Sequence, residues 1–118
     1  MAKECEENLQ KIVAGFRDCR NAFTAIGDET RQLILLVLLE SDLSGIRVGE
    51  IAEKTHLTRP SVSHHLQILK EAGIVAMRRE GTKNYYYFDP EMEAFEQLVS
   101  TLQLAMKISK KLPDRSCE

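Results

Sequence analysis

The 118-residue sequence contains no tryptophan, only three prolines and only three cysteines. The cysteines, Cys5, Cys19 and Cys117, are odd in number and lack the paired spacing of a zinc motif, which argues against a disulfide framework. The longest apolar run, residues 33–39, is far shorter than the ~20 residues that span a bilayer. No apolar segment typical of a secretory signal follows the N-terminus. The sequence therefore predicts a cytoplasmic protein with reduced thiols and no membrane contact.

The sequence also lacks an excess of positive charge, because its formal net charge is −2. Overall basicity is the usual mark of a nucleic-acid-binding domain. The charge is unevenly placed, however, since residues 59–84 carry five basic and two acidic side chains, a local balance of +3. Against the total of −2, the remaining residues carry −5. Such a split can orient one face toward phosphates.

The chain has the length of one ordinary domain, and its 43% hydrophobic residues supply one modest core. We therefore expect a single domain over residues 1–118. Residues 8–26 are predicted to form one amphipathic helix, since apolar residues recur there every three or four positions. Gly27 ends this helix, and Asp28 can cap a second helix that runs through residues 32–40.

Two short helices joined by a tight turn are predicted over residues 48–73. The first of them stops near His56. Thr58 can cap the second, Pro60 suits its first turn, and Gly73 suits a left-handed C-terminal cap. This arrangement is a helix-turn-helix.

An extended pattern follows the helix-turn-helix. Three adjacent tyrosines and a phenylalanine at 85–88 favour a strand, which completes a hairpin, or wing, over residues 74–89. Pro90 suits the start of a last helix with an apolar face, over residues 90–112. The predicted fold is mainly α-helical with a small β-hairpin (α+β), a winged helix-turn-helix. The first and last helices, 8–26 and 90–112, each carry an apolar stripe, so we expect a homodimer that pairs through them.

The second helix of the turn presents polar side chains outward if Val62, Leu66 and Leu69 face the core. These outward side chains form hydrogen bonds and include no carboxylate, which suits a major groove about 12 Å wide. Cations of the hairpin can reach neighbouring phosphates. An ordinary solvated helix face is the alternative. The predicted DNA-binding residues are Thr58, Arg59, Ser61, Ser63, His64 and Gln67 of the helix, and Arg78, Arg79 and Lys83 of the hairpin.

Several segments together resemble the arsenic-repressor (ArsR/SmtB) family of winged helix-turn-helix transcriptional regulators. They occur in the order and at the spacing of the family, and the resemblance covers roughly residues 23–105. The segments are IGDETR at 26–31, VGEIA at 48–52, TRPSVSHHL at 58–66, LKEAGIV at 69–75, RREGTK at 78–83 and YYYF at 85–88.

The resemblance implies a dimeric repressor that binds double-stranded DNA at a pseudo-palindromic operator. It also implies release from the operator when an inducer binds, although the sequence does not name that inducer. Ser63 and His64 fall where the family contacts bases, whereas His65, beside the inward Leu66, is expected to pack.

The metal sites of the family are missing from the sequence. The paired cysteines of its metal sensors fall here on Arg47, Gly49 and Ala52, and the other family site needs a histidine beyond His65. We therefore expect no metal site and no cofactor.

The three cysteines leave a thiol-based sensor open as an alternative. Cys5 and Cys19 are 14 residues apart, which places them on nearly the same side of one helix. Cys117 lies beyond the other interface helix, so in a dimer the three thiols could gather around a thiophilic ion such as arsenite or form a disulfide or persulfide switch. The plainer interpretation is that Cys19 packs in the apolar stripe and the other two are terminal thiols.

An enzyme and a protein-binding module are the two other classes of function. No glycine-rich phosphate loop, Ser-His-Asp order or Cys-His pair stands out, so we expect no enzyme. A winged-helix module that binds protein instead of DNA stays open, because a fold does not determine function. Such a module has no reason to gather basic residues on one side. Titration with duplex DNA at two salt concentrations separates the two, since phosphate neutralisation is strongly salt-dependent.

Overall fold

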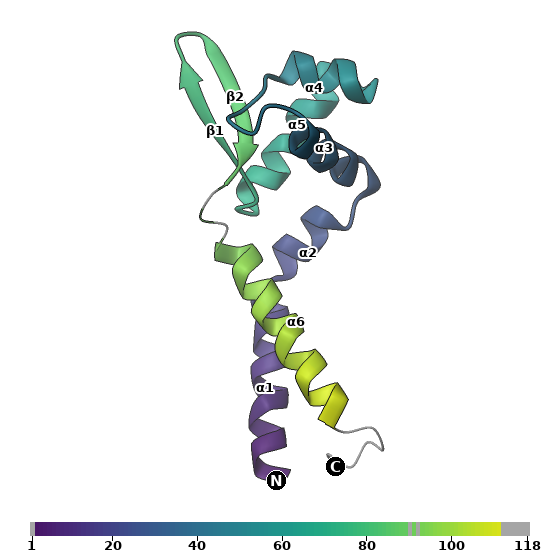
Figure 1. Ribbon diagram of the computed structural model, residues 1–118, viewed down its shortest axis with the longest axis vertical. Coiled ribbons are helices and arrows are strands. Elements are labelled where there is room, and N and C mark those ends of the chain that lie inside the picture. Colours follow the sequence, from purple (N-terminus) through teal and green to yellow (C-terminus); the bar gives the residue numbers. More distant parts are fainter. Residues whose placement is uncertain (1, 90, 92, 112–118) are drawn as a thin grey trace.

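The computed structural model describes residues 2–89, 91 and 93–111 and shows an elongated molecule of 58 × 25 × 21 Å. A head lies at one end and a two-helix stalk at the other (Figure 1). The fold is mainly helical with one two-stranded hairpin, which confirms the predicted class. In chain order, the elements are α1 (Ala2–Asp18), α2 (Arg20–Ile26), α3 (Glu29–Glu40), α4 (Val48–Thr55), α5 (Arg59–Glu71), β1 (Val75–Glu80), β2 (Lys83–Phe88) and α6 (Glu93–Lys111).

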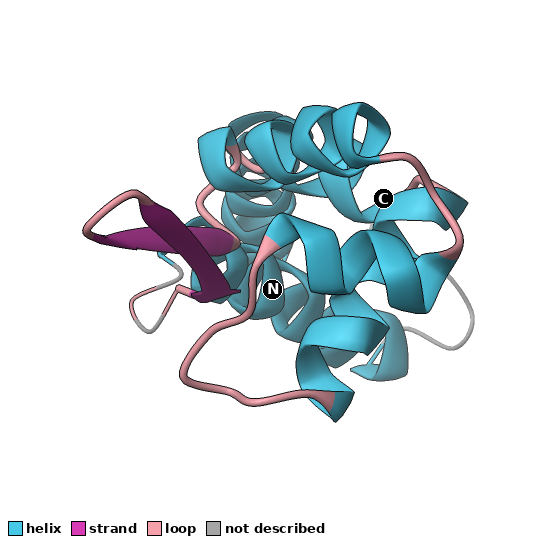
Figure 2. Cartoon of the chain, turned by 90° about the horizontal axis from the view of Figure 1, so that it is seen from above, coloured by secondary structure: helices cyan, strands magenta, loops and turns pink. Residues whose placement is uncertain are grey.

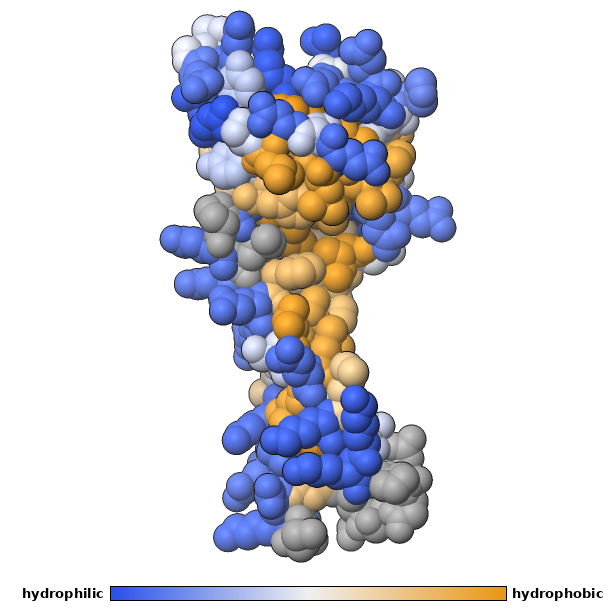
Figure 3. Space-filling view, in the orientation of Figure 1, coloured by the Kyte–Doolittle hydropathy of each residue, from blue (hydrophilic) through white to orange (hydrophobic). Residues whose placement is uncertain are grey.

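The stalk consists of α1 and α6, which run side by side in opposite directions (Figure 1). The two helices approach closely where buried Gly15 of α1 lies against Thr101 of α6. Large apolar side chains on the stalk stay exposed, and the space-filling view shows apolar surface that continues from the head down the stalk (Figure 3). These side chains are Leu9, Val13 and Phe16 of α1 and Val99, Leu102 and Met106 of α6.

Residues 8–26 form parts of two helices, so the prediction of one continuous helix over this range is wrong. Helix α1 ends at Asp18 and α2 begins at Arg20, with Cys19 between them. The main-chain hydrogen bonds continue across this bend, since the Cys19 carbonyl accepts from the Phe23 amide at 3.0 Å.

The bend follows from tertiary packing. Cys19 is only 1% exposed and packs with Ala22 of α2 and Leu98 of α6, which joins the stalk to the head. Helix α1 can then follow α6 while α2 turns onto α3 and α5. Apolar periodicity does not reveal such a bend, because the stripe continues through Cys19 on both sides.

The head is built around α5, which packs against α2, α3 and α4. Its side chains at Val62, Leu66 and Leu69 are fully buried, as the sequence predicted for the inward side. Ile34 of α3 and Ile51 of α4 complete the centre of this core.

The hairpin pairs β1 with β2 in antiparallel register, from Val75 opposite Phe88 to Glu80 opposite Lys83. The turn is therefore two residues long, and its first residue, Gly81, has φ +62°, a conformation that side chains disfavour. The hairpin projects to one side of the helices (Figure 2).

A short segment before α4 anchors the hairpin to the head. The amide of Ile46 donates to the Tyr86 carbonyl at 3.0 Å, and the Tyr86 amide donates back at 2.8 Å. The wing is thus held at its base by main-chain bonds that the sequence did not predict.

Helix α6 begins at Glu93, whereas the sequence predicted a start at Pro90. Pro90 and Leu112, the two ends of that predicted helix, and Cys117 lie outside the described residues. Among the described residues, no helix has both the length and the apolar character needed to cross a membrane.

Candidate nucleic-acid interface

The turn between α4 and α5 is set by two local features. His56 ends α4 with φ +60°, in the left-handed region that histidine enters more readily than bulky residues do. The Thr58 hydroxyl then accepts from the Ser61 amide at 3.2 Å, which confirms Thr58 as the cap of α5. Pro60 lies in the first turn of α5, where its missing N–H is no loss.

The outer face of α5 and its N-cap carry the six polar residues that were predicted from the sequence to bind DNA. Ser63 and His64 are exposed in the middle of the helix, one turn beyond the exposed Arg59. Ser61 is half-buried, and Gln67 is exposed and donates to the Glu71 carboxylate at 3.0 Å. This face can therefore present hydroxyl, imidazole, amide and guanidinium groups to a nucleic acid.

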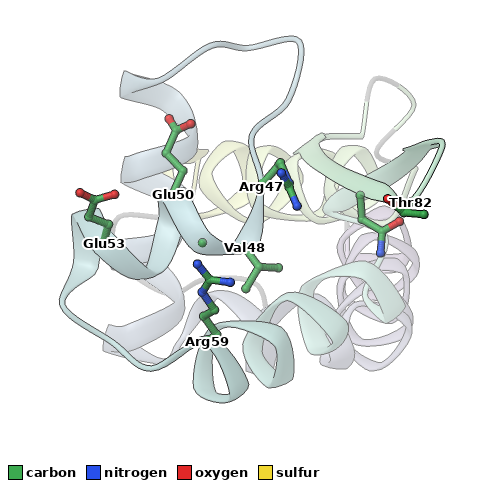
Figure 4. Close-up of a pocket in the computed structure, with 8 residues that line it drawn as sticks. Arg47, Val48, Glu50, Glu53, Arg59 and Thr82 are labelled. Atoms are coloured by element: carbon green, nitrogen blue, oxygen red, sulfur yellow. The ribbon is translucent and has the colours of Figure 1, made fainter.

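A groove of about 510 Å³ opens between the starts of α4 and α5 and the hairpin. Figure 4 shows the side chains of Arg47 and Arg59 pointing into it, while the Glu50 carboxylate points away. Thr82 and Asn84 line the groove from the hairpin. Two arginines, Arg47 and Arg59, and two acidic residues, Glu50 and Glu53, line this groove, so its formal charges balance and only the arginines offer a contact for an anion at the N-terminal end of α4.

Sequence reasoning missed Arg47, Thr82 and Asn84. Arg47 precedes the basic stretch that began at Arg59, and only the fold brings the two arginines to one groove. A basic residue directly before a helix start, as at Arg47, was the signal that could have found it.

The three hairpin cations differ in what they contact. Lys83 is exposed, and so is Arg79, whose Nε donates to the Gly81 carbonyl at 3.0 Å. Arg78 is held on the head instead, because its Nη1 donates to the Ser44 carbonyl and its guanidinium lies 4.8 Å from the ring centroid of Tyr85. The structure therefore brings Arg79 and Lys83, but not Arg78, to the exposed part of the wing.

His65 lies on the inner side of α5, as the sequence predicted. It is half-buried, and its Nδ1 lies 3.2 Å from Nη1 of the buried Arg31. Burial above all lowers the pKa of His65, and the positive charges of Arg31 and His64 act in the same direction, whereas Asp28 opposes them. The lowered pKa favours the neutral imidazole, and the inner position of His65 places it against Arg31.

The cysteine environment does not favour a reactive thiol at Cys19. Its side chain is buried and its Sγ lies 3.9 Å from the Ala94 carbonyl. Burial, with a smaller effect of Asp18, raises the pKa of this thiol, which lowers the fraction of nucleophilic thiolate. Within residues 2–89, 91 and 93–111, no group of three His, Cys, Asp or Glu side chains could hold a metal ion.

Known proteins share both the sequence and the arrangement of this chain. The sequence profile of the bacterial regulatory protein arsR family matches residues 28–76. An uncharacterized HTH-type transcriptional regulator of Methanocaldococcus jannaschii is 43% identical over 81 residues, which cover 68% of this chain and 89% of that protein. The transcriptional repressor SdpR of Bacillus subtilis is 44% identical over 66 residues, 56% of this chain and 70% of that one.

A solved structure shows the same fold. The homodimeric winged helix-turn-helix DNA-binding domain Mb0332 of Mycobacterium bovis matches with a TM-score of 0.60 at 26% identity, over 83% of this chain and 88% of that chain. The relatives from Methanocaldococcus jannaschii and Bacillus subtilis are named as transcriptional regulators and not as enzymes, in agreement with the sequence-based expectation. The chain therefore belongs to the ArsR family of bacterial regulatory proteins and is a DNA-binding transcriptional regulator.

Proposed function

We propose that this chain acts in the cytoplasm as a homodimeric repressor that binds a pseudo-palindromic DNA operator and leaves it when an inducer binds. The observation that carries the proposal is that the polar, cationic surface and the apolar surface lie at different places on one domain. The polar face of α5 and the exposed cations of the wing lie at one place in the head, whereas exposed apolar side chains lie elsewhere, on α3 at Leu36 and Leu39 and along the stalk. One part is suited to DNA and the other to a second copy.

The stalk supports the homodimer. Leu9 and Val13 of α1 are 43% and 48% exposed, and Leu102 and Met106 of α6 are 41% and 57% exposed. A monomer in water gains nothing from exposing such a stripe. A two-fold interface would bury the stripe of each copy against that of the other. The related winged-helix domain from Mycobacterium bovis is described as homodimeric, which agrees with this assembly.

Base contacts are assigned to the middle of α5. Ser63 and His64 occupy exposed positions on the recognition helix, from which hydroxyl and imidazole groups can reach base edges in the major groove. Gln67 can join them if it exchanges its bond to Glu71 for an adenine edge.

Phosphate contacts are assigned to the helix starts and the wing. Arg47 and Arg59 can bind one phosphate in the groove beside the N-terminal end of α4, and Thr58 and Ser61 lie at the start of α5. Arg79 and Lys83 reach a further phosphate from the wing tip, and Arg78 supports the wing rather than the DNA.

Selection of bound sequences from a random duplex pool, followed by fluorescence anisotropy, tests these roles. Replacing Ser63 or His64 with Ala should cost about 1–3 kcal/mol on the selected operator and relax its sequence preference. Replacing Arg47 or Lys83 with Ala should weaken all duplexes alike and reduce the salt slope by about one unit per lost contact. If none of the four changes alters binding, the assigned DNA surface is wrong.

A thiol-based sensor is the second candidate, and the structure argues against Cys19 as its reactive thiol, whereas Cys5 is disulfide-bonded. Cys19 is the free cysteine among the described residues, and burial raises the pKa of its thiol. Cys117 lies outside the described residues. Cys19→Ser should therefore leave the response to arsenite or peroxide unchanged, and loss of that response would support the sensor.

A module that binds protein without DNA, the other class that the sequence left open, disagrees with the DNA-binding family to which the chain belongs. Such a module would have no need for two arginines in one groove, Arg47 and Arg59, next to a wing that carries the exposed Lys83. A protein that shows no salt-dependent affinity for random duplex would favour this alternative.

A further inference from the structure

Arg31 of α3 is a buried charged residue, only 8% exposed. A buried guanidinium is costly unless its N–H groups are bonded. Its Nε donates to the Ala25 carbonyl at 2.7 Å, and its Nη2 donates to the Thr24 carbonyl at 3.0 Å. Because α2 ends at Ile26, these carbonyls are acceptors that the helix itself leaves without a partner. Arg31 therefore caps the C-terminal end of α2.

The same guanidinium also reaches the recognition helix. Its Nη1 lies 3.2 Å from Nδ1 of His65. Since arginine can only donate, Nδ1 accepts, and the neutral imidazole carries its proton on Nε2. One side chain thus joins α2, α3 and α5.

This junction lies between the DNA-binding face and the stalk. His65 shares α5 with the exposed Ser63 and His64, whereas α2 packs on α6 through Ala22 and Leu98. The bonds of Arg31 therefore relate the direction of α5 to that of the stalk. In a dimer, the stalk relates the two copies, and their recognition helices must meet half-sites about 34 Å apart or a multiple of that.

We propose that Arg31 and His65 are positioning residues for operator recognition, which set the half-site spacing that the dimer reads without touching DNA themselves. This inference rests on the proposed homodimeric DNA-binding function. It assigns a role in specificity to a buried contact, whereas the exposed residues of α5 supply the base contacts.

The test compares two changes at His65. His65→Leu removes the acceptor, whereas His65→Asn keeps an amide oxygen near the place of Nδ1. Affinity is measured for the selected operator, for operators with one base pair added or removed between half-sites, and for a random duplex. Thermal unfolding of each variant checks that it remains folded.

The expected result distinguishes a loss of half-site positioning from a general loss of affinity for DNA. His65→Leu should lower the affinity for the selected operator about tenfold. It should also reduce the ratio between this affinity and the affinity for operators of altered spacing. Binding to the random duplex should stay within about twofold of the wild type, because the phosphate contacts remain. His65→Asn should behave like the wild type. If His65→Leu does not fold, His65→Gln, whose amide reaches the place of Nε2 instead, serves the same comparison.

A pH profile supplies a readout that a merely structural role would not change. Protonation would place a hydrogen on Nδ1 facing the Arg31 guanidinium, so the contact is lost as pH falls through the lowered pKa of His65. Asp28, Arg31 and His64 are the charged or titratable groups that act on His65. Spacing preference, rather than affinity, is measured, because a change at the base contacts of α5 should affect all spacings alike.

The wild type should lose spacing preference on acidification, and His65→Asn should keep it. His56→Asn is the matched control, because His56 is exposed and has φ +60°, which asparagine also tolerates. This control should retain the pH dependence of the wild type. Wild-type spacing preference in His65→Leu would overturn the inference and leave the DNA-binding function intact. A wild type that binds no duplex would refute that function itself.

Discussion

A methyl group added at Gly15 of α1 would collide with Thr101 of α6. An ideal Cβ at Gly15 would overlap Thr101 Oγ1 and would lie 2.9 Å from its Cγ2 and 3.1 Å from its Cβ. Thr101 cannot easily move away, because it is buried and its hydroxyl donates to the Gln97 carbonyl at 2.9 Å. Gly15→Ala should therefore push the two stalk helices apart.

Two opposed effects set the magnitude. Alanine is favoured over glycine inside a helix by about 1 kcal/mol. Overpacking of a tight contact costs about 1–3 kcal/mol. We expect Gly15→Ala to lower the free energy of unfolding by about 1 kcal/mol net, since the short contacts involve a stiff β-branched side chain. Adding Thr101→Ala removes Oγ1 and Cγ2, so the double variant should show a favourable coupling of about 1–2 kcal/mol.

Urea unfolding measures the stability of the wild type, the two single variants and the double variant. The protein concentration is kept the same for all four, because dissociation of a dimer contributes to the transition. Gly49→Ala on α4 is the control. A Cβ there would meet the flexible guanidinium of Arg59, whose Nη2 lies 3.0 Å away and can move. If Gly15→Ala stabilises the protein equally in the wild-type background and in the Thr101→Ala background, the close crossing of α1 and α6 does not exist.

Three further predictions concern caps and the stalk. Thr58→Ala should cost about 1 kcal/mol in urea unfolding, whereas Thr58→Asp should keep the cap but weaken DNA binding, because a carboxylate then faces phosphate. A hydrogen bond from the Arg31 amide lowers the pKa of Asp28 below 3.8, so its stabilisation is present above that value and is lost as pH falls through the lowered pKa. The deficit of Asp28→Ala in free energy of unfolding should accordingly shrink from neutral to acid pH. Leu102→Asp should convert the dimer to a monomer in sedimentation, and an unchanged dimer would place the interface elsewhere.

Local chemistry made much of the fold predictable. Thr58 caps α5, Gly73 adopts φ +77° after it, and three consecutive tyrosines lie in β2. Each of these features depends on a few neighbouring residues, through a cap, a backbone conformation or a side-chain preference for strands. The outward placement of Ser63 and His64 likewise followed from helical periodicity alone.

The sequence by itself thus determined the order of elements, the helix-turn-helix and the polar face of α5. Tertiary structure decided what depends on contacts between distant residues. It placed the bend at Cys19, lined one groove with both Arg47 and Arg59, and brought Arg78 of the wing to the Ser44 carbonyl. It also joined Arg31 to His65, 34 positions away. Periodicity reports only which side of an element faces inward, whereas these contacts depend on how the elements pack against one another.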